Sequence, residues 1–203
     1  SPDSIAWLTN IRGADVPYTP FSLGYGIFYN DCSLDFFNDP RKFTNKQLNK
    51  MGRDLNIYSP DNFLPTLRKL GAKKINIGLD YNSTSQIIYQ TIKRSGAKLE
   101  HIDDPCQLEK ATKTEVELAG MRNAHIRDGV ALAKFLFWID KKSGSGKLTE
   151  LNVADKLESF RREGAKIQGL SFPTISGSGP NGAIVHYRVS EKSSKKLKKN
   201  SLY

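Results

Sequence analysis

The stretch DDPCQLEKATKTEVELAGMRNAHIRD, residues 103–128, divides the 203-residue chain into two parts with different patterns. Proline disfavours a helical conformation at the residue before it, so Asp104-Pro105 predicts a break in regular structure. Short helical and strand patterns alternate before this break, and the longest helical pattern of the chain begins after it. We therefore expect one domain at residues 1–104 and a second domain at residues 105–203.

The helix after the break is indicated by a start signal and an apolar stripe. Thr112 and Glu115 fit the T-x-x-E capping box, in which two side chains satisfy the free N–H groups of the first helical turn. Apolar residues then recur at helical spacing, namely Leu118, Met121, Leu132, Phe135 and Ile139. The run FLFW at residues 135–138 is apolar all round, so we expect this end of the helix to be buried.

Residues before the break have the pattern of an α/β layer. Short apolar or alternating runs predict strands at residues 24–29, 34–37, 74–79 and 97–102. The first two of these strands are expected to pair across Asn30-Asp31. One helix is predicted over Leu64, Leu67 and Leu70, from Asp61 to Gly71, and another over residues 87–92, from Ser83 to Gly96. This alternation favours an α/β fold with partly parallel strand pairing.

The last part of the chain changes from helix to strand patterns. Thr149 is expected to begin a helix over Val153, Leu157 and Phe160. Strands are predicted at residues 170–175 and 183–188, joined by a loop rich in Gly, Ser, Pro and Asn. Leu202-Tyr203 has the pattern of a third strand that begins at the last residues.

Composition and charge exclude several classes of protein. A hydrophobic content of 38% with 10% aromatic residues is typical of a globular protein and not of a disordered one. No apolar run approaches the roughly 20 residues needed to cross a bilayer, so we expect no membrane association. The net charge of +10 gathers partly at residues 192–199. That stretch lacks aromatic residues for base stacking, so a solvated loop is favoured over a nucleic-acid interface.

The cysteines and histidines do not form a local catalytic or metal-binding motif. Cys32 and Cys106 have no metal-ligand or disulfide spacing, which indicates reduced thiols in a cytoplasmic protein. His101 is expected to be exposed, and His125 to be a buried residue beside the apolar stripe of the long helix. His186 shares one face of its predicted strand with Ile184 and Arg188. A functional role for His186 stays open on the pattern alone.

Three segments together resemble the three-domain Xaa-Pro aminopeptidases. SIAWLTNIRGAD at residues 4–15 is similar to a motif of their middle domain, and EVELAGMRNAHIRD at residues 115–128 is similar to the helix that opens their catalytic domain. LSFPTIS at residues 170–176, followed by GPNGAIVHY at residues 179–187, resembles the hairpin that lines their substrate cleft. The order and spacing of these segments cover essentially the whole chain.

The resemblance implies a fold in two pieces. Residues 1–104 would be a creatinase-N-like α/β middle domain without its start. Residues 105–203 would be the incomplete N-terminal part of a pita-bread α+β catalytic domain. In this family two divalent metal ions, usually manganese, are held by Asp, His and Glu ligands that we expect beyond residue 203. The resemblance therefore implies no metal ligand in this chain, and we expect the 203 residues alone to be inactive.

The resemblance also implies an activity, a substrate and one site residue. Family members release the N-terminal residue that precedes proline, so the expected partner is a peptide with proline at its second position. They are commonly cytoplasmic homodimers. His186 matches a cleft histidine that hydrogen-bonds the substrate and moves protons without binding metal. Arg12 and Asp15 match the middle-domain motif, where a structural role is expected.

Two other interpretations stay open at this point. The whole protein would be a prolidase or creatinase relative if its specificity differed within the same reaction class. It would be a non-catalytic pita-bread protein that binds peptides or histones if the metal ligands were lost.

Overall fold

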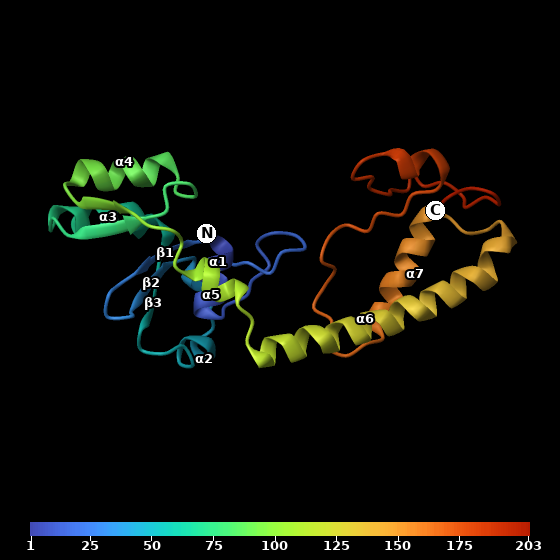
Figure 1. The fold of residues 1–203 in the computed structure, drawn as a ribbon, viewed down its shortest axis with the longest axis horizontal. Coiled ribbons are helices and arrows are strands. Elements are labelled where there is room, and N and C mark those ends of the chain that lie inside the picture. The colour runs from blue at the N-terminus through green and yellow to red at the C-terminus, as the bar shows by residue number, and fades with distance from the viewer. The chain divides into compact units, whose positions relative to one another are not determined.

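The computed structural model describes all 203 residues, which form two compact units, Ser1–Lys113 and Thr114–Tyr203 (Figure 1). The division falls after Lys113. The Asp104-Pro105 step had predicted a division after residue 104. Helix α5 (Cys106–Ala111) stays with the first unit because it packs against helix α1 (Pro2–Thr9). An ion pair from Lys110 to Asp3 joins these two helices.

The first unit contains two small sheets. Strand β1 (Tyr25–Phe28) is antiparallel to β2 (Leu34–Phe37), as predicted, and β2 is parallel to β3 (Leu55–Tyr58). The second sheet pairs β4 (Asn76–Leu79) with β5 (Lys98–His101) in parallel. A parallel pair needs a crossover connection, and helix α4 (Gln86–Ser95) provides it. The predicted α/β layer with partly parallel pairing is therefore confirmed, whereas β3 and α1 were not predicted.

Helices α3 (Phe63–Ala72) and α4 lie side by side over an apolar core (Figure 1). Phe37, Phe63, Leu67 and Ile92 are buried together, and partly buried residues of strands β1, β4 and β5 and of both helices pack around them. Gly71 was predicted to end α3, but the helix continues through it. A Cβ at this position would lie 1.6 Å from Ser95 Oγ of α4, so glycine is needed for the close approach of the two helices. Gly96 does end α4, in the left-handed conformation that glycine adopts readily.

Short elements connect the larger ones. They are the 3₁₀ turns η1 (Pro40–Lys42), η2 (Pro60–Asn62), η3 (Ser143–Ser145) and η4 (Gly179–Ala183), and the one-turn helix α2 (Asn45–Leu48). Ser85, and not the predicted Ser83, is the residue before α4. Asp80 accepts a hydrogen bond from the Ser83 hydroxyl, which places Ser83 in the preceding turn.

The second unit is built on two packed helices, α6 (Glu115–Lys142) and α7 (Glu150–Arg162). The capping box of α6 is formed by Thr114 and Glu117, two residues later than predicted. The predicted Thr112 instead donates its hydroxyl hydrogen to the Leu108 carbonyl at the end of α5. Helix α7 begins after Thr149, as predicted, because the Thr149 side chain caps it together with Asn152.

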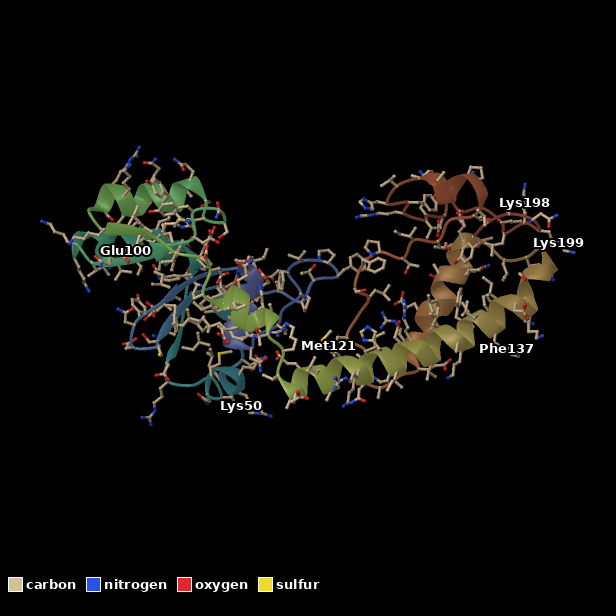
Figure 2. All side chains as sticks on the ribbon, viewed as in Figure 1. Lys50, Glu100, Met121, Phe137, Lys198 and Lys199 are labelled. Carbon is tan, nitrogen blue, oxygen red and sulfur yellow. The ribbon has the colours of Figure 1, made fainter.

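The end of α6 is buried on one face only. Phe135 packs with Leu148 and Val153 in the core between the helices and is 6% exposed. Phe137, labelled in Figure 2, is 67% exposed, and Leu136 is also exposed. The predicted all-round burial of residues 135–138 is therefore wrong, because α7 covers only one face of the helix. No helix of the chain is both long and apolar enough to span a membrane.

The predicted strands at residues 170–175 and 183–188 are absent. His186 has a φ of 53°, which lies in the left-handed region and interrupts an extended conformation. The backbone hydrogen bonds in this segment close turns, as in the bond from Tyr187 N–H to the Ile184 carbonyl. Neither segment lies beside a strand with which to form a ladder, and hydrogen bonding to a neighbour is what makes a strand stable. The third strand predicted at Leu202-Tyr203 is absent too.

Replacing Ile92 with alanine should destabilise the first unit by about 2–5 kcal/mol, because the substitution leaves a cavity in a closed apolar core. Ile92 is 0% exposed. The matched control is Ile87→Ala on the same helix, where the side chain is 61% exposed and the expected change is within about 0.5 kcal/mol. Urea unfolding of the two variants measures this difference, and equal destabilisation would contradict the assigned core.

Candidate functional site

The candidate site lies on the segment from Ser176 to Tyr203, which we call the C-terminal loop. It is coloured orange-red to red in Figure 1 and lies beside the start of α7. Backbone bonds tie it there, from Glu150 N–H to the Lys195 carbonyl and from Leu197 N–H to the Leu148 carbonyl. Leu197 also packs against the core of the second unit. The lysine side chains of the basic stretch are exposed on this loop, including Lys198 and Lys199 (Figure 2).

Glu150, the first residue of α7, is completely buried beneath this loop. Its carboxylate accepts hydrogen bonds from Ser178 N–H at 2.6 Å and from Lys195 N–H at 3.0 Å. The Tyr187 hydroxyl donates to Oε2 at 2.8 Å, and the Asn181 amide lies 3.0 Å from both carboxylate oxygens. No cation pairs with this carboxylate, and all of these donors are neutral groups.

The pKa of Glu150 reflects a balance between burial and hydrogen bonding. Burial raises the pKa of a carboxyl group, because it disfavours the charged form. The donors from Ser178, Lys195, Tyr187 and Asn181 favour the charged form and together outweigh burial, so the pKa lies below its ordinary value. The position at the start of a helix favours a negative charge as well. Glu150 is therefore an anion at neutral pH.

Further polar contacts extend from this carboxylate. The Ser176 hydroxyl donates to the Glu150 carbonyl at 2.6 Å and lies 3.0 Å from the Tyr203 hydroxyl. The Tyr187 hydroxyl also lies 3.1 Å from Ser193 Oγ. Burial raises the pKa of both tyrosines, and the neighbouring Glu150 charge adds to this effect. Both hydroxyls therefore stay protonated at neutral pH and are able to donate.

His186 lies next to Tyr187 and is presented to solvent. Tyr187 is buried, whereas His186 and its neighbours Ile184 and Val185 are exposed. The imidazole makes no hydrogen bond or ion pair within the chain. His186 was expected to share one strand face with Ile184 and Arg188, but no strand forms there. An exposed imidazole without an internal partner is free to contact a ligand.

The other predicted polar residues are not brought to this site. His125 was expected to be buried but is exposed on α6, with Nδ1 2.9 Å from the Met121 carbonyl. Every residue of α6 from Ala119 to Val130 is exposed, so no face of the helix is covered around His125. His101 lies in the first unit, where it stacks on Tyr81. Cys32 is exposed and Cys106 is buried, and both are free thiols.

Arg12 and Asp15 make internal contacts in the first unit. The Arg12 guanidinium donates to the Ala6 and Ile11 carbonyls. Asp15 accepts a hydrogen bond from Leu23 N–H at 2.7 Å and pairs with Lys42. These contacts hold the segment after α1 in place.

Potential metal ligands do not gather at one point in this structure. A dinuclear site needs several His, Cys or carboxylate ligands that converge on one point. No group of three or more such side chains lies together in the structure. Glu150 has its lone pairs occupied by neutral donors and has no second acidic or histidine side chain beside it.

Sequence reasoning missed Glu150 as part of the site. A signal was present, because Glu150, Val153 and Leu157 follow the i, i+3, i+7 spacing of one helix face. Val153 and Leu157 belong to the core, and an acidic residue on the same helix face is buried with them and needs hydrogen-bond partners. The partners themselves come from 28 to 45 residues away, where no local pattern points to them.

Comparison with known proteins gives the class to which this architecture belongs. Residues 1–117 match the Creatinase/Prolidase N-terminal domain family, and residues 119–203 match metallopeptidase family M24. The chain therefore belongs to the creatinase/prolidase family, with a mixed α/β N-terminal domain followed by part of an M24 domain. This agrees with the fold class expected from the sequence.

The most similar relatives include Xaa-Pro aminopeptidases. A probable Xaa-Pro aminopeptidase P of Aspergillus clavatus is 38% identical over 92% of this chain and 29% of its own length. Xaa-Pro aminopeptidase 1 of Dictyostelium discoideum is 38% identical over 95% of this chain and 31% of its own length. The chain thus spans about a third of the length of these relatives.

Solved structures agree with these relatives. The X-prolyl aminopeptidase of Caenorhabditis elegans, described as a cytosolic enzyme with a di-nuclear active site, has a TM-score of 0.84 and 31% identity. It matches 98% of this chain, which covers 33% of the nematode protein. An X-Pro aminopeptidase of Thermotoga maritima, with a TM-score of 0.65 and 20% identity, shares the fold.

The second unit should lose stability as the pH falls below 4.5, the ordinary pKa of the Glu150 carboxyl. The pKa of Glu150 is lowered in the folded state, so the carboxylate stabilises that state at pH values above its ordinary pKa. This contribution is lost as the pH falls through the lowered value. Urea unfolding at several pH values, followed by Trp138 fluorescence in a chain carrying Trp7→Phe, measures the effect.

Asp155→Asn is the control for this pH dependence, because Asp155 is exposed on the same helix. It should keep the decrease in stability at acidic pH, whereas Glu150→Gln should flatten it. A wild-type second unit whose stability does not change between about pH 6 and 3 would contradict the role of the buried carboxylate.

Proposed function

We propose that the chain is part of a metal-dependent Xaa-Pro aminopeptidase, which releases the N-terminal residue that precedes proline in a peptide. The observation that supports this most directly is the similarity to Xaa-Pro aminopeptidases over more than nine-tenths of the chain. The match of residues 119–203 to metallopeptidase family M24 supports the proposed reaction class, metal-dependent peptide hydrolysis. The substrate is a peptide with proline at its second position.

Within this function, His186 binds the substrate and transfers a proton. Its imidazole is exposed and has no partner in the chain, and it is carried by a loop that Glu150 anchors. A neutral imidazole carries one N–H donor and one acceptor nitrogen, so it can donate a hydrogen bond to the peptide and accept a proton during the reaction. Its similarity to the family's cleft histidine supports the same role.

The metal ligands of the whole protein lie outside these 203 residues in this proposal. No cluster of potential ligands is present in the chain, whereas the nematode relative is described as having a di-nuclear active site. Two divalent ions, of which manganese is the expected identity, would supply Lewis-acid chemistry in the whole protein. A cytoplasmic location and a homodimer are further parts of the proposal, the first supported by the description of the nematode enzyme as cytosolic.

The experiment compares the 203-residue chain with the product of the complete gene, using an Arg-Pro-Pro peptide in the presence and absence of Mn²⁺. We expect release of arginine only by the complete protein and only with metal, because this chain supplies no ligand cluster. Cleavage by the 203 residues alone would contradict the assignment of the ligands. No cleavage by the complete protein would favour a non-catalytic peptide-binding protein instead.

Replacing His186 with alanine in the complete protein should lower kcat by about 10²-fold or more, the usual contribution of a positioned acid or base. His125→Ala is the matched control, because this imidazole is also exposed but lies on α6. Steady-state kinetics with Arg-Pro-Pro, together with metal analysis of each variant, makes the comparison. Equal activity of the two variants would remove His186 from the mechanism.

A further inference from the structure

One buried carboxylate holds both ends of the loop segment that carries His186. On the N-terminal side, Ser178 N–H donates to Oε1 of Glu150 at 2.6 Å. On the C-terminal side, Lys195 N–H donates to Oε2 at 3.0 Å. Two backbone groups on either side of His186 are thus tied to a single side chain of α7, so the path of the chain between them is restrained.

A third contact comes from the residue next to His186. Tyr187 is buried and its hydroxyl donates to Oε2 of Glu150 at 2.8 Å. His186 is exposed and has a φ of 53°, a conformation that a non-glycine residue adopts only when its surroundings fix it. The bond from Tyr187 to Glu150 fixes one side of this strained position, and it keeps the adjacent imidazole directed to solvent.

Only an ionised carboxylate can satisfy this set of donors. Oε1 receives Ser178 N–H and the Asn181 amide, and Oε2 receives Tyr187, Lys195 N–H and the same amide. A glutamine has a single oxygen, so one half of these donors would face an NH₂ group, which is itself a donor. Glutamine has nearly the shape of glutamate and yet cannot replace it here.

We propose that Glu150 is a positioning residue for His186, which fixes the loop through Ser178, Tyr187 and Lys195 and so holds the imidazole in one orientation. Glu150 does not contact the substrate in this role. The effect on the loop is independent of the reaction, and its catalytic consequence rests on the proposed Xaa-Pro aminopeptidase function.

The first test measures order at His186 in the 203-residue chain by {¹H}–¹⁵N heteronuclear NOE and amide hydrogen exchange. The wild-type His186 amide should be as ordered as that of His125 on α6. In Glu150→Gln the His186 amide should become mobile, and exchange at Ser178 and Lys195 should rise at least tenfold. His125 and His101 should keep their wild-type values, because they lie on separate elements.

Two variants keep this test decisive. Asp155→Asn removes the same charge from an exposed position of α7 and should change none of the signals. Tyr187→Phe removes one bond to Glu150 and should mobilise His186 in the same direction by a smaller amount. The proposal is overturned if His186 is mobile in the wild type or unchanged in Glu150→Gln. It is also overturned if His125 loses its order together with His186, because Glu150 would then support the whole unit.

The second test is a double-mutant cycle in the complete protein. Glu150→Gln should lower kcat for Arg-Pro-Pro at least tenfold with unchanged metal content, and it should cause no further loss when His186 is already alanine. Additive losses would mean that Glu150 acts through something other than His186. If the wild-type complete protein does not cleave the peptide, the proposed function fails, and the order at His186 alone decides the positioning role.

Discussion

A carboxylate buried without a cation is the constraint on which the C-terminal loop depends. Removing a charge from water costs several kcal/mol unless hydrogen bonds replace the lost solvation. Glu150 recovers this cost from donors that lie 28, 31, 37 and 45 residues along the chain. Burial of Glu150 and the path of the loop are therefore coupled, because a loop that covered the carboxylate without supplying these donors would leave a buried charge without partners.

The first unit depends on a different kind of interaction. Phe37, Phe63, Leu67 and Ile92 form a closed apolar core between the strands and helices α3 and α4. This core contains no charged side chain, so its apolar contacts do not themselves depend on pH. Close packing of the helices limits which side chains fit here, because even one added carbon at Gly71 would clash with Ser95.

The sequence predicted the elements that local signals define. Thr149 begins α7 and Gly96 ends α4, because capping and the left-handed conformation are properties of one or two residues. The prediction of strands at residues 170–175 and 183–188 was wrong, because an apolar run forms a strand only beside another strand. His186 was predicted from family resemblance and stays a prediction, whereas Glu150 was not predicted because its partners are distant in the sequence.

A hydrogen-bonded anchor and an apolar core place different limits on a loop. Apolar contacts are non-directional, so a loop packed only by them can shift by small amounts at little cost. Hydrogen bonds to a buried carboxylate weaken steeply when the angle or distance changes. The Tyr187 side chain is fixed by one such bond, with a left-handed residue immediately before it. A directional anchor beneath an exposed imidazole is therefore better suited than packing alone to give that imidazole a single orientation.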